Sequence, residues 1–258
     1  MSDLLTLERR GHAAIITMNN PPANIWTIDS LYLLKDIVEG LNADKDNYAL
    51  VLTGQGEKFF CAGADLKMFA DGDKDNARKA AQAFGEGFQA LTDYEGVSIA
   101  AINGFAMGGG LEAAMACDIR IAESQAKMAL PEAKVGLLPC GLGTQHLPAL
   151  VGEGWAKRMI LCNEQLKADK ALEIGLVQEV VETGKALEAA LALAERVAEQ
   201  SPSSVKVCKK LIMGGRNLPM NENLTLERDA FADLFDTKDQ LEGVTAFLEK
   251  RKPEWTNS

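Results

Sequence analysis

The chain has 258 residues, of which 47% are hydrophobic and 25% charged, and this composition excludes a disordered or collagen-like protein. Its 27 Lys and Arg residues and 37 Asp and Glu residues give a formal net charge of −10. We therefore expect no nucleic acid as a main partner, because phosphate binding needs a basic surface. At about 150 residues per domain, the length predicts one large domain, or one domain with an appendage.

The sequence shows no sign of secretion or membrane insertion. The N-terminus lacks the pattern of a secretory signal, and the apolar uncharged stretch 96–111 is 16 residues long with five glycines, too short and too broken to span a bilayer. We therefore expect no membrane partner and a cytoplasmic protein. The five cysteines form no CxxC pair, which predicts no metal site and reduced, mostly buried thiols.

Strands and helices alternate in the first hundred residues. Short apolar runs predict strands at 12–18 and 48–53, and Leu and Val at helical spacing predict a helix at 28–41. The polar stretch 70–79 is typical of a mobile surface loop leading into a helix near 77–92. The apolar run 98–103 predicts a strand that is buried on both faces.

The character changes to helices after residue 150. Apolar periodicity predicts helices at 186–200, 201–212, 222–236 and 239–250. The last two carry apolar faces that must be buried, either on their own core or on a partner chain. With no internal repeat and no low-complexity linker, a separately folding second domain is not required.

The segment INGFAMGGGLEAAMACDI (102–119) carries the sharpest local signal, an apolar strand that meets a glycine cluster before a helix. Glycines there expose backbone N–H groups at a helix N-terminus, where negative charge is favoured. The segment lacks the GxxxxGK[ST] and GxGxxG patterns, and Glu112 would repel a phosphate. The pattern favours an oxyanion hole for a carbonyl that becomes an enolate, although glycines also allow close helix–strand packing.

Two further segments carry candidate site residues. The loop KFFCAGADLKMF (58–69) also offers exposed amides, although Asp65 alone is more typical of a helix cap. In MALPEAKVGLLPCGLGTQHL (128–147), Glu132 lies in an apolar setting that raises a carboxyl pKa and suits it to proton donation. The alternative for Glu132 is a helix-start carboxylate. Glu112 and Glu132 can divide acid and base roles.

With two histidines and no HExxH or GxSxG, a histidine-based triad is not expected.

Together these segments resemble the crotonase superfamily, specifically enoyl-CoA hydratases of the β-oxidation type. The resemblance rests on FFCAGADLK, AAINGFAMGGGLEAAMACDIRIA, LPEAKVGLLP, GLGTQHLPALVG and AFLEKRKPEW, and it covers nearly the whole chain. It implies an α/β fold, a crotonase-like spiral of ββα units in residues 1–197 with the active site, and a C-terminal helical trimerisation region in 198–258. It also implies a homo-oligomer, a trimer or a dimer of trimers.

The resemblance assigns roles to individual residues. It implies an oxyanion hole made by the amides of Ala64 and Gly109, a water held and activated by Glu112, and a proton exchanged at the α-carbon by Glu132. The residues that it places along the substrate and its coenzyme A are Ala62, Ala64, Asp65, Leu66, Lys67 and Gly109, with Phe231, Phe247 and Lys250 reaching the nucleotide end from a neighbouring protomer. Trp26, Met68, Phe69 and the 70–79 loop are expected to border the acyl pocket.

The implied activity is addition of water across a trans-2-enoyl-CoA to give a 3-hydroxyacyl-CoA, with no metal or redox cofactor, coenzyme A being part of the substrate. Two departures from the family are Cys140, where a glycine is usual after the proline, and His146, which replaces an arginine and is interpreted as structural. The alternatives are an enoyl-CoA isomerase, a hydratase for branched or aromatic acyl groups, and a non-catalytic CoA-binding or RNA-binding member.

Overall fold

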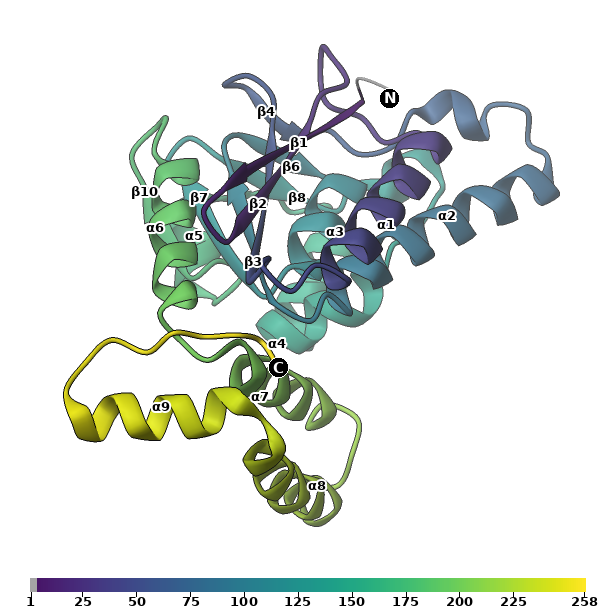
Figure 1. The fold of residues 1–258 in the computed structure, drawn as a ribbon. Coiled ribbons are helices and arrows are strands. Elements are labelled where there is room, and N and C mark those ends of the chain that lie inside the picture. The colour runs from purple at the N-terminus through teal and green to yellow at the C-terminus, as the bar shows by residue number, and fades with distance from the viewer. Residues whose placement is uncertain (1–3) are drawn as a thin grey trace.

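The computed structural model describes residues 4–258, which form two β-sheets with helices packed against them (Figure 1). The strands are β1 (Leu5–Arg10), β2 (Ala13–Met18), β3 (Ala49–Gly54), β4 (Phe59–Cys61), β5 (Val97–Ile102), β6 (Phe105–Met107), β7 (Ile119–Glu123), β8 (Lys127–Ala129), β9 (Leu166–Lys167) and β10 (Glu179–Val181). The α-helices are α1 (Ile28–Asn42), α2 (Lys74–Thr92), α3 (Gly109–Ala116), α4 (Gly143–Leu161), α5 (Ala168–Glu173), α6 (Ala186–Ala198), α7 (Pro202–Gly214), α8 (Met220–Asp233) and α9 (Lys238–Glu249). Short 3₁₀ helices are η1 (Leu66–Phe69), η2 (Glu132–Val135) and η3 (Leu234–Asp236).

Each of the strand pairs β3 and β4, β5 and β6, and β7 and β8 places one strand in each of the two sheets. The larger sheet has the order β1-β2-β3-β5-β7-β10 and is parallel from β2 onward, and the smaller has the order β4-β6-β8-β9 with its first three strands parallel. The pairs β3 and β4, β5 and β6, and β7 and β8 are each followed by a helix. This is the spiral of ββα units that the sequence resemblance implied, and the α/β fold class is confirmed.

The larger sheet is apolar on both faces because helices cover both. Alternate residues such as Ile16 and Leu52 pack into the core with α1, α2 and α3, whereas their neighbours Ile15 and Val51 pack against α6. Figure 1 shows α6 on the opposite side of this sheet from α1 and α2. Because side chains alternate between the two faces of a strand, β2 and β3 contribute to two hydrophobic cores, one on each face of the sheet.

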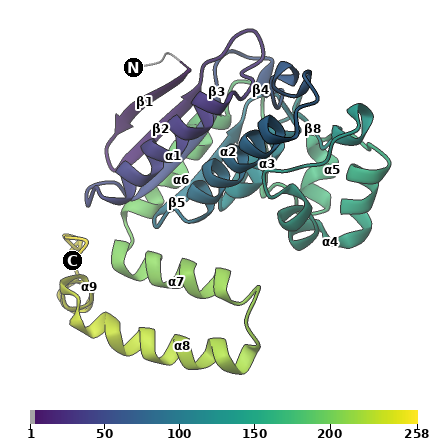
Figure 2. The same cartoon turned by 90° about the vertical axis from the view of Figure 1, so that its right-hand side faces the viewer.

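The C-terminal helices lie away from this body. In Figure 2, α7, α8 and α9 lie below the sheets and helices of the preceding chain. Lys209 of α7 ties them to the body, because its Nζ donates to Asp118 Oδ2 at 2.7 Å and to the Gly96 carbonyl at 3.0 Å. Large apolar side chains on α8 and α9 remain exposed, among them Phe231 at 65% and Phe247 at 83%. The predicted division between residues 197 and 198 falls at the end of α6 and stays a prediction.

Most predicted elements are present within a few residues, and two expectations were wrong. Helix α2 begins at Lys74, inside the stretch predicted as a loop, because the Asp73 side chain accepts from the amides of Asp75 and Asn76 and caps the helix. The cysteines are not mostly buried: Cys61 and Cys117 are buried, Cys140 is partly buried, and Cys162 and Cys208 are exposed, all five as free thiols. A helix long and apolar enough to cross a bilayer is absent from residues 4–258.

Candidate active site

The site lies at one edge of the smaller sheet. The loop that begins at Ala62 follows β4, Gly108 follows β6, and Pro131 and Glu132 come two and three residues after the end of β8. These three strands are parallel neighbours, so their carboxyl ends meet at the same edge. The spiral of the chain therefore gathers three segments that are far apart in sequence.

The amides of Ala64 and Gly109 are free to bind a ligand. Trp26 forms a parallel β-bridge with Ala64: the Trp26 N–H donates to the Gly63 carbonyl, and the Trp26 carbonyl accepts from the Asp65 N–H. The N–H of Ala64 therefore points away from Trp26. Gly109 is the first residue of α3, where an N–H has no partner inside the helix. Neither amide donates to another acceptor within residues 4–258. Both residues line one pocket.

Glycines bring these loops into close contact. A Cβ on Gly63 would lie 3.0 Å from the carbonyl oxygen of Met107, and one on Gly108 would lie 2.9 Å from Glu132 Oε1. Both glycines have positive φ, +101° and +53° respectively, which other residues rarely adopt. At Gly110 a Cβ would lie 2.2 Å from the carbonyl oxygen of Cys61. The cluster therefore serves both predicted purposes, since Gly110 allows close packing and Gly109 presents a free amide.

Glu112 of α3 is 2% exposed and held firmly. Its Oε1 accepts from the amide of Gly141 at 2.9 Å and from that of Gly143 at 2.8 Å. Burial raises the pKa of Glu112 to about 8, helped by the negative charge of Glu132 and opposed by the two amides. The sequence did not predict these two donors.

Glu132 begins η2 and is held less tightly. It lies in the first turn of η2, directly after Pro131, as the helix-start interpretation predicted. Its Oε2 is buried with no hydrogen-bond partner within residues 4–258. Burial raises the pKa of Glu132 to about 7. A buried oxygen without a partner, beside an open pocket, is available to a substrate.

A single pocket of about 650 Å³ joins these groups. Of the predicted site residues, those that line it are Ala62, Ala64, Leu66, Gly109, Glu112 and Glu132. Asp65 and Lys67 do not line it: Asp65 caps η1 by accepting from the amide of Lys67 at 3.0 Å, as the cap interpretation predicted. Phe231 of α8, Phe247 of α9 and Lys250 just after α9 lie outside the pocket of their own chain.

The predicted border of the acyl pocket needs a correction. Phe69 lines the pocket, as does Ala77 from the 70–79 stretch. Trp26 and Met68 do not line the pocket. Trp26 is 1% exposed and lies behind Gly109, because its Nε1 donates to the Gly109 carbonyl at 3.2 Å. Met68 packs against the core. Sequence reasoning missed Ala81 and Phe84 of α2, whose place in an apolar helix gave no sign of a pocket.

The two departures from the family lie in different surroundings. Cys140 lines the pocket, and burial together with the charges of Glu112 and Glu132 raises its thiol pKa to about 11. His146 lies on α4 outside the pocket, with Nδ1 3.2 Å from the carbonyl oxygen of Met115. The contact supports the structural interpretation of His146.

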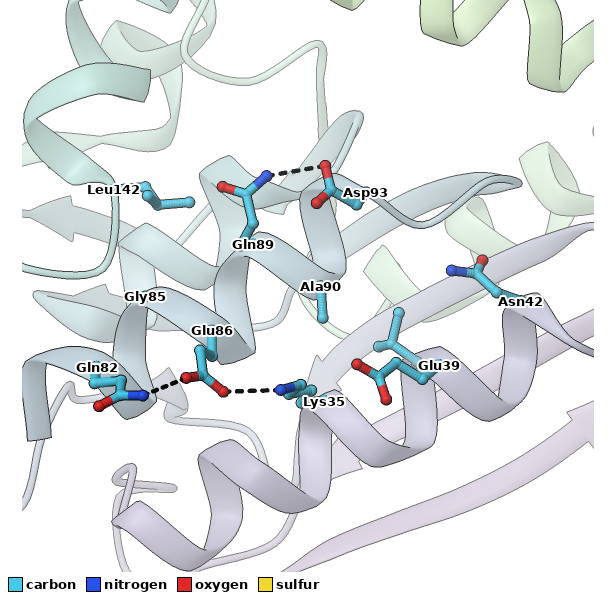
Figure 3. Close-up of a pocket in the computed structure, with 11 residues that line it drawn as sticks. Lys35, Glu39, Asn42, Gln82, Gly85, Glu86, Gln89, Ala90, Asp93 and Leu142 are labelled. Atoms are coloured by element: carbon cyan, nitrogen blue, oxygen red, sulfur yellow. Dashed lines mark hydrogen bonds and ion pairs between the residues drawn. The ribbon is translucent and has the colours of Figure 1, made fainter. Parts of the chain in front are cut away.

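A second hollow of about 570 Å³ lies between α1 and α2 and has a different character (Figure 3). Polar side chains line it, and Lys35 Nζ and Gln82 Nε2 each donate to Glu86, at 2.8 and 2.7 Å. It holds none of the predicted site residues. Residues 4–258 also contain no group of three or more His, Cys, Asp or Glu side chains arranged to hold a metal ion.

Comparison with known proteins agrees with this geometry. Residues 8–258 match the family described as enoyl-CoA hydratase/isomerase. The chain is 41% identical over 249 residues to a short-chain-enoyl-CoA hydratase of Clostridium acetobutylicum, covering 96% of this chain and 95% of that one. The structure of Pseudomonas aeruginosa DspI is 64% identical, with a TM-score of 0.96 over 98% of this chain and 97% of that one. That of an enoyl-CoA hydratase from Bacillus anthracis is 35% identical, with a TM-score of 0.95 over 99% and 100%. The protein belongs to the enoyl-CoA hydratase/isomerase family and has its crotonase fold.

Proposed function

We propose that the protein is an enoyl-CoA hydratase, which adds water across the double bond of a trans-2-enoyl-CoA to give a 3-hydroxyacyl-CoA. The observation that carries the proposal is a pocket in which two desolvated carboxyl groups, Glu112 and Glu132, accompany two free amides. The hydratase from C. acetobutylicum, similar over nearly its whole length, supports the same reaction.

The two amides stabilise the charge that develops on the substrate. The thioester oxygen accepts from the N–H groups of Ala64 and Gly109, and it becomes an enolate oxygen as water attacks the β-carbon. A correctly placed donor contributes about 2.7–4 kcal/mol to such a transition state. Gly109 opens α3, so the positive end of that helix adds to the effect.

The two glutamates divide the proton transfers. Glu112 holds the attacking water and takes its proton, because the amides of Gly141 and Gly143 bind Oε1 and favour the charged form of the carboxyl. Glu132 gives its proton to the α-carbon, for which its raised pKa and unpartnered Oε2 suit it. The proton gained by one carboxyl balances the proton lost by the other.

Coenzyme A is bound at the edge of the pocket by Ala62, Asp65, Leu66 and Lys67 in this proposal. Lys67 is exposed on η1, where its charge can meet the phosphates. Lys250 is likewise exposed, just beyond α9. Because Phe231, Phe247 and Lys250 lie outside the pocket of their own chain, we assign them to the nucleotide end of a substrate bound by a neighbouring copy.

The assembly follows from the same helices. The exposed apolar faces of α8 and α9 need a partner, so we propose a homotrimer or a dimer of trimers. Light scattering coupled to size exclusion is expected to give three or six times 27.8 kDa. A monomeric mass would contradict both this assembly and the shared substrate site.

The reaction needs no added cofactor in this mechanism, since every step uses carboxyl groups, backbone amides and water. Five free thiols also suit a reducing compartment, which supports a cytoplasmic location.

Hydration is tested by incubating the purified protein with crotonyl-CoA and identifying the product. The expected result is loss of the enoyl absorbance with formation of 3-hydroxybutyryl-CoA. A panel of branched, aromatic and 3-enoyl substrates separates the other family reactions, since a shift of the double bond without water uptake would indicate an isomerase. Submicromolar, salt-sensitive RNA binding without turnover would contradict the proposal.

A further inference from the structure

The catalytic pocket continues beyond the two glutamates along one face of α2. Phe84, Ala81 and Ala77 of this helix all line it. Their spacings of three and four residues place them in one row on the helix surface. At 1.5 Å per residue, the row from Phe84 to Ala77 extends about 10 Å along the helix axis.

The row leads from the reaction centre to the surface. Phe84 is 2% exposed and packs beside Gly109, since a Cβ on that glycine would lie 2.8 Å from its ring carbon Cε1. One turn away, Ala81 is partly buried, and Ala77 at the far end is exposed. The row therefore begins beside one of the two oxyanion amides and opens to solvent.

The chemistry of the row suits a hydrocarbon chain. Its three side chains offer no hydrogen-bond donor or acceptor, and Phe69 and Leu138 add further apolar surface to the pocket. The pantetheine arm of coenzyme A contains amide groups that need hydrogen-bonding partners, and its nucleotide carries phosphates. Neither belongs on this wall, so the acyl chain is the part of the substrate that follows α2.

We propose that Ala81 and Ala77 determine the length of acyl chain that the enzyme accepts. The inference rests on the proposed hydratase function and names its substrate class: straight-chain enoyl groups considerably longer than crotonyl. A crotonyl group ends one methyl beyond the β-carbon and stops short of Ala81. Longer chains must pass Ala81 and then Ala77, where the small methyl side chains leave the channel open.

The test measures kcat/KM for crotonyl-, hexenoyl-, octenoyl-, decenoyl- and dodecenoyl-CoA, all trans-2, in three variants. Ala81→Phe blocks the channel near the reaction centre, and Ala77→Phe blocks it about 6 Å further out. Gln82→Phe is the matched control, because it adds a ring to the same helix on the side that faces the hollow with α1 (Figure 3). Thermal melting of each variant verifies folding.

We expect kcat/KM to fall beyond a chain length that depends on which alanine is replaced. In Ala81→Phe, kcat/KM relative to crotonyl-CoA falls at least tenfold from hexenoyl-CoA onward, and in Ala77→Phe only from about decenoyl-CoA onward. Gln82→Phe changes these ratios less than twofold. If the wild type hydrates crotonyl-CoA but rejects the longer chains, or if Ala81→Phe leaves the ratios unchanged, this inference is wrong and the hydratase function stands. If the wild type hydrates none of the five, the proposed function fails and the inference fails with it.

Discussion

Glu112 and Glu132 face one pocket but are held in opposite ways. Oε1 of Glu112 accepts two backbone hydrogen bonds, whereas Oε2 of Glu132 is buried and finds no hydrogen-bond partner among residues 4–258. Hydrogen bonds to a carboxylate favour its charged form, and burial alone favours the neutral form. The two amides thus act toward a charge on Glu112, but its deeper burial outweighs them and gives it the higher pKa, about 8 against about 7 for Glu132. The proposed hydration uses the form of the pair that carries one proton, placed on Glu132.

The pH dependence of activity follows from this division. Burial raises both pKa values, to about 8 for Glu112 and about 7 for Glu132, and each charge disfavours the other. The productive state, with one proton on the pair, is lost at low and at high pH. We expect kcat/KM for crotonyl-CoA to follow a bell with its maximum between about pH 7 and 8. A profile that is flat from pH 5 to 10 would contradict the roles of both carboxyls.

Stability should respond to pH through Glu132. A carboxyl whose pKa is raised from 4.5 to about 7 is best tolerated below pH 4.5, and its desolvation destabilises the fold increasingly as pH rises toward 7. Glu132→Gln removes this effect. The free energy of unfolding of the variant minus that of the wild type should therefore rise by about 1–3 kcal/mol between pH 4.5 and pH 7. Urea unfolding at several pH values measures the gain. The exposed control Glu195→Gln should differ by less than about 0.5 kcal/mol throughout, and an equal gain in both variants would refute the explanation.

Gly108 should be needed for activity more than for folding. Gly108→Ala places a Cβ 2.9 Å from Glu132 Oε1 and so displaces the carboxyl. Gly184→Ala is the control, because its φ of +81° is also positive while no atom lies within 4 Å of the new Cβ. An alanine at positive φ costs each variant about 1–3 kcal/mol of stability, but only Gly108→Ala should lose tenfold or more in kcat. Equal kcat values for the two would show that Gly108 does not position Glu132.

Cys140 should resist alkylation despite lining the pocket. Burial and the neighbouring carboxylates raise its thiol pKa to about 11, so little thiolate forms near neutral pH. Cys162 is exposed at the end of α4. Peptide mass spectrometry after brief iodoacetamide treatment at pH 7.5 should find Cys162 labelled well before Cys140. Preferential labelling of Cys140 would mean that its surroundings stabilise the thiolate.

Elements with a strong apolar period could be predicted from the sequence, and those without one could not. Leu31, Leu34 and Val38 predicted α1 because one face of that helix is fully buried. The first turn of α2 is exposed on all sides, so only its Asp73 cap marks it. Strands β4, β6 and β8 have three residues each, too few to show a period, although they form the edge that carries the site.

The site was predictable where local patterns carry it. The motifs pointed to Glu112, Glu132, Ala64 and Gly109, and all four line the pocket. The amides that hold Glu112 were missed, because they lie 29 and 31 positions further along the chain and no periodicity relates such distant residues. The wall made by Ala77 and Ala81 was missed because alanine on a helix is most often a packing residue.

The most direct test of the two-carboxyl mechanism is the rate of crotonyl-CoA hydration by Glu112→Gln and Glu132→Gln beside the wild type. Both substitutions keep the shape of the side chain and remove its ability to exchange a proton. Since general acid–base catalysis contributes about 10²–10⁴-fold, each variant should lose at least two orders of magnitude in kcat while folding normally. Hydration by folded Glu132→Gln at the wild-type rate would contradict the mechanism.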